Sequence, residues 1–298
     1  MADPELDTVV SQIQQLDPEG LRIGRVLRQT LDQLYNGQHT GRYRWDQLHK
    51  TEKTHCGTLV EINLHREFNF EDGVAMDYRI GGIDVDCKYS QTLGGWMIPV
   101  EAMGHLCILV WSDDVQSKWS LGVVRISDEI LGKGGNRDSK RSISAAGREH
   151  IHWVFSDAPL PPNILLQLPK ATVDQIMGLP SGQQRIDEIF RVAQRMRIGR
   201  GVIATLGQQD DFMKRVRGNG GSRSRLRPEG ILVLGHFEEH KRIAAALGVP
   251  IPERGELVSV RVVPTSSEAE GTVVINDGRW RIAGPSDTVT PAPKCSHC

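Results

Sequence analysis

The clearest chemical signal in this sequence of 298 residues comes from two aspartates and a lysine. Residues 83–89 read IDVDCKY, and the side chains of such a strand alternate between two faces, so Asp86 and Lys88 share one face. Asp77 lies nine residues before Asp86, and Gly81-Gly82 between them predicts a tight hairpin turn. We therefore expect the carboxylates of Asp77 and Asp86 to lie close together, with Lys88 beside them.

Glu61 offers a third carboxylate, because the expected helix 54–68 places it among apolar neighbours. Carboxylates that converge on one point repel one another unless a hard cation lies between them, and oxygen ligands suit Mg²⁺. A metal ion polarises a phosphoryl oxygen and acidifies bound water, while a fixed lysine cation stabilises developing negative charge. Glu61, Asp77, Asp86 and Lys88 therefore indicate metal-dependent phosphodiester hydrolysis.

A plainer explanation exists for part of this set. Asp86 and Lys88 alone would also fit a surface ion pair worth under about 1 kcal/mol. Asp77, the glycine turn and Glu61 favour the metal site over that explanation. Asp84 shares the face of Asp86 and is either a support for the metal site or a solvated carboxylate at the sheet edge.

The elements that must position these residues are helices first and strands afterwards. Two amphipathic helices are expected to start at Asp3-Pro4 and Asp17-Pro18, the second ending at Gly37. The hairpin follows, with strands 76–80 and 83–89, and further strands are expected at 96–100, 106–111, 121–126 and 152–155. This order predicts an α/β body with a mixed sheet flanked by helices.

A proline-rich segment divides the chain. Residues 157–163 hold three prolines in seven residues, which predicts a stiff linker unable to pair between domains 1–156 and 164–298. The second domain is expected to contain a strand at 231–234, paired strands at 257–263 and 271–275, and helices at 172–177, 184–196, 209–216 and 238–247. Helices packed against a small hairpin resemble a winged helix-turn-helix.

The charge of the chain is divided unevenly between its halves. Residues 1–160 carry a net charge of -6 and residues 161–298 a net charge of +5, although the whole chain has only -1. Such asymmetry indicates a polyanion-binding module joined to an acidic part, with a solvated basic face as the alternative. About six neutralised phosphates would give a log-log salt slope near -5. The candidate DNA-binding residues are Lys133, Arg137, Lys140, Arg141, Lys214, Arg215, Arg217, Arg223, Arg225 and Arg227.

Composition limits the class of protein. Hydrophobic residues at 39% and charged residues at 24% exclude a mostly disordered chain, and no apolar run approaches a membrane span. An acidic N-terminus and five scattered cysteines predict a reduced, cytoplasmic protein. Cys295 and Cys298 have a CxxC spacing beside His297, but a structural zinc needs four ligands, so a frayed terminus is expected.

At Asp77 and Asp86-Cys87-Lys88 the sequence resembles the PD-(D/E)xK nuclease core, and it is more closely similar to the NaeI-type (type IIE) restriction endonucleases. Order and spacing agree from about residue 20 to 160, and the matching stretches are 38–43, 54–63, 85–90 and 96–99. By this resemblance, Glu61, Asp77 and Asp86 look like Mg²⁺ ligands, and Lys88 looks like the residue that orients or activates the attacking water.

The resemblance also implies an overall plan. It implies a restriction-endonuclease-like N-terminal domain and a C-terminal helix-turn-helix domain related to the catabolite activator protein. It implies a homodimer that cuts both strands of a GC-rich palindrome, GCCGGC for the enzyme that gives the family its name, once a second copy of the site is bound. No motif transfers for the residues that read bases.

Two other functions stay open at this point. The first is a repair-type nicking endonuclease, which would use the same residues on one strand. The second is a non-catalytic regulator whose winged helix binds an operator while the N-terminal domain senses a ligand. The regulator accounts for the charge division but not for Glu61, Asp77, Asp86 and Lys88.

Overall fold

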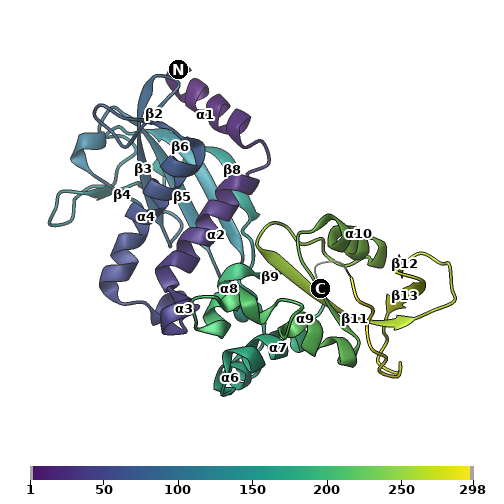
Figure 1. The fold of residues 1–298 in the computed structure, drawn as a ribbon. Coiled ribbons are helices and arrows are strands. Elements are labelled where there is room, and N and C mark those ends of the chain that lie inside the picture. The colour runs from purple at the N-terminus through teal and green to yellow at the C-terminus, as the bar shows by residue number, and fades with distance from the viewer. Residues whose placement is uncertain (1–2, 296–298) are drawn as a thin grey trace. The chain divides into compact units, whose positions relative to one another are not determined.

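The computed structural model describes residues 3–295, which group into two compact units (Figure 1). The first unit holds the chain up to Leu34 together with Leu48–Pro161, and the second holds Tyr35–Gln47 together with the chain from Pro162 onward. The unit boundaries therefore differ from the predicted 1–156 and 164–298. Residues 35–47 join the second unit because the Asn163 side chain donates to the Tyr43 carbonyl at 2.8 Å and Gln38 bonds Asp210 at 3.1 Å.

Three long helices belong to the first unit: α1 (Pro4–Leu16), α2 (Leu21–Tyr35, whose last residue groups with the second unit) and α4 (Lys50–Phe68). Asp3 caps α1 as predicted, because its side chain accepts the N–H of Leu6. The predicted cap of α2 is wrong. Asp17 ends α1 instead, and its carboxylate accepts the N–H of Ile23 at 2.8 Å, inside the first turn of α2.

The end of α2 also differs from the expectation. Asn36, rather than Gly37, takes the left-handed conformation, with φ of 49°. Asparagine tolerates this region better than most residues that carry a side chain. Gly37 instead opens the short helix α3 (Gly37–Thr40) of the second unit.

A mixed sheet of six strands forms the centre of the first unit, in the order β1-β2-β3-β5-β6-β8. Strands β3 and β5 run parallel and the other neighbours antiparallel, so the predicted α/β class with a mixed sheet flanked by helices is confirmed (Figure 1). A separate short pair joins β4 to β7. The bounds are β1 (Glu71–Asp72), β2 (Tyr78–Ile80), β3 (Ile83–Ser90), β4 (Met97–Ile98), β5 (Leu106–Asp113), β6 (Lys118–Arg125), β7 (Arg141–Ser142) and β8 (His152–Pro159).

The start of the expected linker is wrong. Residues 157–159 finish β8, where Ala158 lies opposite Trp119 and Pro159 opposite Lys118. Strand β8 is the edge of the sheet, and proline is tolerated on an edge strand because its missing N–H faces away from the ladder. The Pro159 carbonyl still accepts a hydrogen bond from the Trp119 indole at 3.2 Å.

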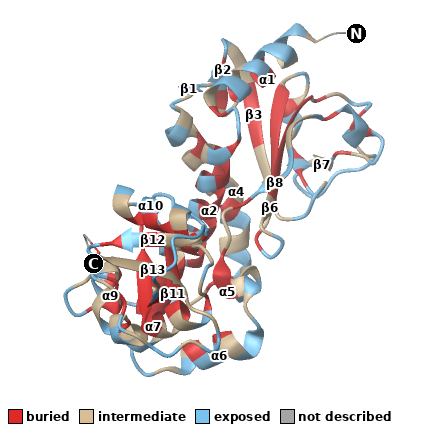
Figure 2. Cartoon of the chain, turned by 90° about the vertical axis from the view of Figure 1, so that its right-hand side faces the viewer, coloured by how far each residue is buried: buried red, intermediate tan, exposed pale blue. Residues whose placement is uncertain are grey.

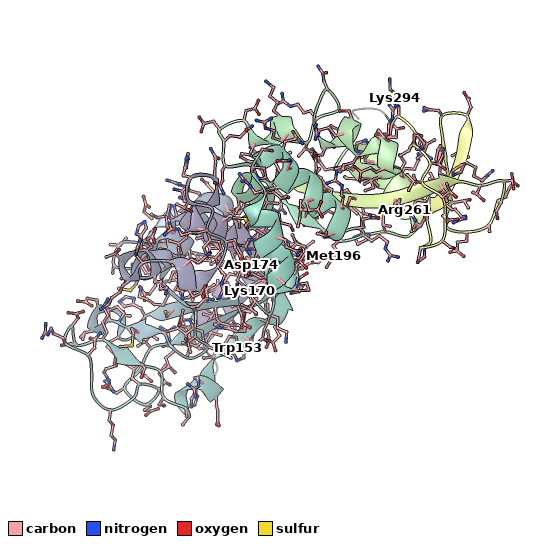
Figure 3. All side chains as sticks on the ribbon, turned by 90° about the horizontal axis from the view of Figure 1, so that it is seen from below. Trp153, Lys170, Asp174, Met196, Arg261 and Lys294 are labelled. Carbon is pink, nitrogen blue, oxygen red and sulfur yellow. The ribbon has the colours of Figure 1, made fainter. Side chains whose placement is uncertain are left out.

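The second unit packs short helices on a smaller sheet. Its helices are α3, α5 (Ile164–Gln167), α6 (Lys170–Gly178), α7 (Gly182–Val192), α8 (Arg200–Gly207), α9 (Ser222–Arg225) and α10 (Glu238–Leu247). On α6, Lys170 and Asp174 lie one turn apart and form an ion pair of 2.5 Å (Figure 3). The strands are β9 (Ile198–Gly199), β10 (Ile231–Leu234), β11 (Glu256–Pro264), β12 (Thr272–Ile275) and β13 (Gly278–Ile282).

Two expectations for this unit are wrong. Strands β11 and β12 do not pair with each other, because β13 lies between them in the order β10-β11-β13-β12. Trp280 and Ile282 of β13 pack on the core, while Arg279 and Arg281 pair with Glu268 and Asp287. The expected helix 209–216 is only a 3₁₀ turn, Phe212–Arg215, and the helix in this region is α8.

Buried residues, red in Figure 2, lie on the helices and strands that face the interior of each unit. In the first unit, Trp96, Cys107 and Leu109 belong to a cluster on one face of the sheet. In the second unit, Cys295 is only 7% exposed and packs in the cluster that contains Ile243, so the expected fraying does not apply to it. His297 and Cys298 lie outside the described residues. Across residues 3–295 we find no helix with the length and apolar character that a membrane crossing requires.

Candidate active site

The glycine turn of the hairpin brings Asp77 and Asp86 together, as predicted. Gly81 and Gly82 have φ of 59° and 81°, a left-handed pair that glycine adopts without strain and that suits a two-residue hairpin. The register sets Tyr78 opposite Val85, which brings Asp77 next to the β3 backbone near Asp86. The Asp77 carboxylate accepts the N–H of Cys87 at 2.8 Å, so its position is fixed by strand β3.

Lys88 lies between the two aspartates. Its Nζ is 2.6 Å from Asp86 Oδ1 and 3.5 Å from Asp77 Oδ2, and it donates to the Cys87 carbonyl at 2.9 Å. Burial alone would lower the pKa of Lys88, but the charge and hydrogen bond of Asp86 outweigh burial and raise it. Lys88 is therefore a fixed ammonium at neutral pH.

Asp86 is the most buried acid of the group, with 5% of its surface exposed. The parallel register sets it opposite Cys107 of β5, whose thiol donates to Asp86 Oδ2 at 3.5 Å. Burial raises the pKa of Asp86, the Lys88 ammonium opposes the increase, and the Asp77 carboxylate adds to it. Burial and the repulsion between the Asp77 and Asp86 carboxylates therefore outweigh the single charge of Lys88, and a divalent cation would relieve this electrostatic cost.

Glu61 lies on α4 and is half-buried rather than fully enclosed. Burial raises the pKa of Glu61, the Asp77 carboxylate raises it further, Lys88 lowers it, and Asp86 makes a smaller contribution. Glu61 thus shares one electrostatic environment with the hairpin residues. Its backbone carbonyl accepts a hydrogen bond from the Tyr78 hydroxyl at 2.7 Å, which ties α4 to strand β2.

The donor set fits a hard divalent ion by its chemistry. Asp77 and Asp86 share a single counter-charge, and carboxylate oxygens are preferred ligands of Mg²⁺. The described residues contain no ready-made group of three or more His, Cys, Asp or Glu side chains with metal-binding geometry. Lys88, rather than a third carboxylate, bonds the two aspartates here.

Asp84 has a structural role that differs from the role of Asp86 on the same strand. Its carboxylate accepts the N–H groups of Ala75 at 2.7 Å and Val74 at 3.3 Å. The bond from Ala75 is the main cause of the lowered pKa of Asp84. Asp84 therefore fixes the loop that leads into Asp77 from outside the acidic cluster.

The basic residues of the first unit fall into two kinds. Lys133 and Arg137 are exposed in the loop before β7, and Lys140 is half-exposed. Arg141 pairs with Asp128 at 2.6 Å and donates to the Gly132 carbonyl at 3.0 Å, so it also closes this loop.

In the second unit, Lys214, Arg215, Arg217 and Arg225 are exposed. Arg215 also donates to the Gln209 side chain at 2.9 Å, and Arg217 pairs with Asp211 at 3.6 Å. Burial lowers the pKa of Arg223, which donates to the Val233 carbonyl at 3.0 Å and lies over a phenylalanine ring. Arg225 pairs at 2.7 Å with Asp187, whose side chain is 2% exposed. Arg227 is half-buried.

Sequence reasoning missed Tyr78 and Cys107. Both are buried and contact a candidate ligand residue, Tyr78 at Glu61 and Cys107 at Asp86. The position of Tyr78 directly after Asp77 was a usable signal, but an aromatic residue in a strand is ordinarily read as core packing. Cys107 carried no signal, because its contact depends on the pairing of β3 with β5.

The chain is similar to known proteins over nearly its whole length. A family model described as Restriction endonuclease NaeI matches residues 7–291. The Type II restriction enzyme NaeI of Lentzea aerocolonigenes is 49% identical over 299 residues, which covers 98% of this chain and 94% of that protein. Both matches include the hairpin and α4.

Proposed function

Because the chain belongs to the NaeI restriction endonuclease family, it is a type II site-specific restriction endonuclease, and we propose that Glu61, Asp77, Asp86 and Lys88 form its cleavage centre. The observation that carries the proposal is the Lys88 ammonium held between Asp77 and Asp86, with Glu61 in the same electrostatic environment. The alternative of a non-catalytic regulator is wrong for a member of this family.

We assign each residue a role in phosphodiester hydrolysis. Glu61, Asp77 and Asp86 would hold Mg²⁺, which when bound polarises the phosphate and acidifies water. Lys88 keeps its proton, so it donates hydrogen bonds that orient the attacking water and stabilise charge on the phosphate. The bond from the water oxygen to phosphorus forms as the bond from phosphorus to the leaving oxygen breaks, while the attacking water gives a proton to solvent and the leaving oxygen takes a proton from solvent.

The cleavage experiment uses the full chain and plasmid DNA with Mg²⁺. Lys88→Ala and Asp86→Ala are expected to abolish cleavage and to leave DNA binding largely intact. Lys118→Ala is the matched control, because Lys118 is a half-buried lysine of β6 in the same unit. A Lys88→Ala protein that cuts as fast as the parent would refute the role of Lys88.

We further propose that the first unit is a PD-(D/E)xK endonuclease domain and the second a winged-helix DNA-binding domain. The net charge of +5 from residue 161 onward supports the second assignment, as does the exposure of Lys214, Arg215 and Arg217. The exposed Lys133 and Arg137 would hold the substrate at the acidic first unit. Removing residues that contact phosphates should weaken binding to all sequences and flatten its salt dependence.

The substrate proposed is a GC-rich palindrome in double-stranded DNA, GCCGGC by family resemblance, cut on both strands by a cytoplasmic homodimer after a second site is bound. Sequencing the ends of digested phage DNA identifies the site. Supercoiled plasmid that ends as linear product supports double-strand cleavage, and open circles would favour the nicking alternative. Comparing plasmids with one and two sites tests second-site activation, and sedimentation tests the dimer.

A further inference from the structure

Tyr78 joins the two parts of the proposed cleavage centre that come from different elements. It follows Asp77 directly in the chain, begins β2, and is 1% exposed. We propose that Tyr78 is a positioning residue, whose hydroxyl holds Glu61 of α4 in register with Asp77 and Asp86 of the hairpin. This inference rests on the proposed function, because it assigns Tyr78 a part in the same site.

The hydroxyl of Tyr78 meets both elements that carry the acids. It donates to the Glu61 backbone carbonyl at 2.7 Å. The same hydroxyl interacts with the Cys87 thiol, and Cys87 lies between Asp86 and Lys88 in β3. One side chain thus contacts the helix at Glu61 and the strand beside Asp86.

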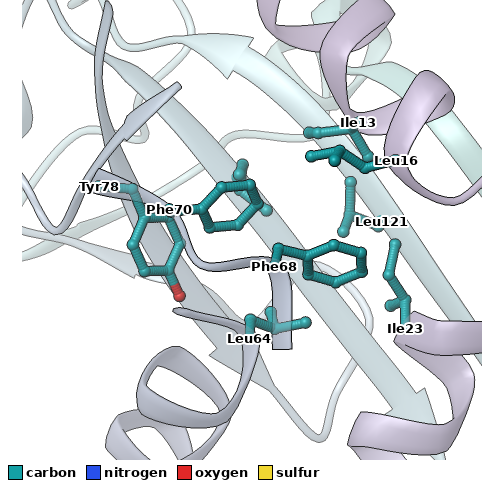
Figure 4. Close-up of a pocket in the computed structure, with 9 residues that line it drawn as sticks. Ile13, Leu16, Ile23, Leu64, Phe68, Phe70, Tyr78 and Leu121 are labelled. Carbon is teal, nitrogen blue, oxygen red and sulfur yellow. The ribbon is translucent and has the colours of Figure 1, made fainter. Parts of the chain in front are cut away.

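The ring of Tyr78 is held separately from its hydroxyl. It packs on Phe70 with ring centroids 5.2 Å apart and stacks on His65 at 5.7 Å. The ring also lines a small apolar pocket together with Leu64 and Phe68, and Figure 4 shows Tyr78 beside Phe70 in this pocket. A phenylalanine at this position would keep these ring contacts and lose only the hydroxyl.

Helix α4 needs directional bonds because few of its side chains are buried, and the bond from Tyr78 is one of them, beside the bond from Asn63 to Thr30 at 2.9 Å. Of its 19 residues, the buried ones are Cys56, Val60 and Leu64, which form a single stripe. A stripe of apolar contacts fixes the distance of a helix from a sheet but resists sliding and rotation less well than a directional hydrogen bond. The hydrogen bond from Tyr78 to the Glu61 carbonyl resists sliding and rotation of α4 at Glu61, the residue whose carboxylate must reach the site.

The test compares Tyr78→Phe with the control Tyr43→Phe. Tyr43 is also a buried tyrosine, but it packs in the core of the second unit. Each full-length protein is bound to a DNA duplex with an uncleavable linkage. The protein–DNA complex is then titrated with Mn²⁺, and the concentration of unbound ion, measured by electron paramagnetic resonance, gives the affinity for Mn²⁺. Asp86→Asn is measured in parallel.

The proposal predicts that Tyr78→Phe weakens Mn²⁺ binding about tenfold, as is typical when a partner of a metal ligand is removed. The Mg²⁺ concentration for half-maximal cleavage should rise by the same factor, with most of the rate recovered at saturating Mg²⁺. Tyr43→Phe should change neither quantity, and thermal unfolding should show both variants folded.

Two results would overturn the inference in distinguishable ways. If Tyr78→Phe binds Mn²⁺ like the parent while Asp86→Asn does not, Tyr78 has only a structural role and the proposed function stands. If Asp86→Asn also binds Mn²⁺ like the parent, the acids are not metal ligands, and the proposed function and the role of Tyr78 fail together.

Discussion

Replacing Lys88 by methionine should destabilise the protein most when no divalent ion is present. The substitution leaves Asp86, with 7% of its side chain exposed, and Asp77 without the ammonium 2.6 Å and 3.5 Å away. Removing one partner of a buried ion pair costs about 3–5 kcal/mol. The Lys88 side chain is itself 23% exposed, so solvent screens part of this interaction and about 2–3 kcal/mol is expected.

A bound divalent ion would supply the missing charge. Mg²⁺ at about 100 times its dissociation constant stabilises a folded protein by about 2.7 kcal/mol. Mg²⁺ should therefore stabilise Lys88→Met more than the parent, because the ammonium no longer competes for the carboxylates. Cleavage should stay absent, since the cation that faces the phosphate is lost.

The assay is urea unfolding in EDTA and in Mg²⁺, followed by tryptophan fluorescence. Four of the six tryptophans lie in the first unit and report its transition: Trp96, Trp111, Trp119 and Trp153. Lys118→Met is the control. The double variant Asp86→Asn with Lys88→Met should regain most of the lost stability, because the unpaired charge is removed. Equal stability of Lys88→Met and the parent in EDTA would refute the reasoning, as would an equal response to Mg²⁺.

Three further predictions concern the turn, the second unit and acid stability. Gly82→Ala should cost about 1–2 kcal/mol, because φ is 81° there, and should slow cleavage by loosening Asp77; unchanged urea unfolding would argue against it. Lys214→Ala should reduce the salt slope of DNA binding, measured by fluorescence anisotropy, by about 1 with no change in stability. Asp187→Ala should instead destabilise the second unit by about 1–3 kcal/mol in calorimetry, because the buried Ser222 hydroxyl loses its bond to Asp187 while Arg225 is half-exposed to solvent. The hydrogen bond from Arg125 lowers the pKa of Asp3. The stability that this pair contributes is therefore present above the unfolded pKa near 3.8 and is lost as pH falls through the folded pKa. In Asp3→Asn the melting temperature should consequently fall less steeply with pH in the acid range than in the parent.

The parts of the site that were predictable are those built from neighbouring residues. The alternation of residues 83–89 and the turn Gly81-Gly82 are local, so the approach of Asp77, Asp86 and Lys88 followed from the sequence. Cys107 approaches Asp86 through the pairing of β3 with β5, and no local pattern encodes which strands become neighbours.

The errors in the predicted fold also arise from contacts between residues far apart in the sequence. Pro159 read as a linker residue, but it lies on an edge strand, where proline does no harm. Strand β13 was missed because Arg279 and Arg281 make it look polar, although both arginines find acidic partners. The ion pair of Arg225 with the buried Asp187 also had no local signal, and the DNA contact of the half-exposed Arg225 stays a prediction.

The measurement that tests the metal centre most directly is anomalous X-ray scattering from Mn²⁺ in crystals of the protein with DNA. An ion bound by oxygen atoms of Asp77 and Asp86 at about 2.1–2.2 Å, with Glu61 oriented toward it and Lys88 turned to the phosphate, is the expected result. An ion held elsewhere on the protein, with Lys88 still bonded to both aspartates while the DNA is cut, would contradict it.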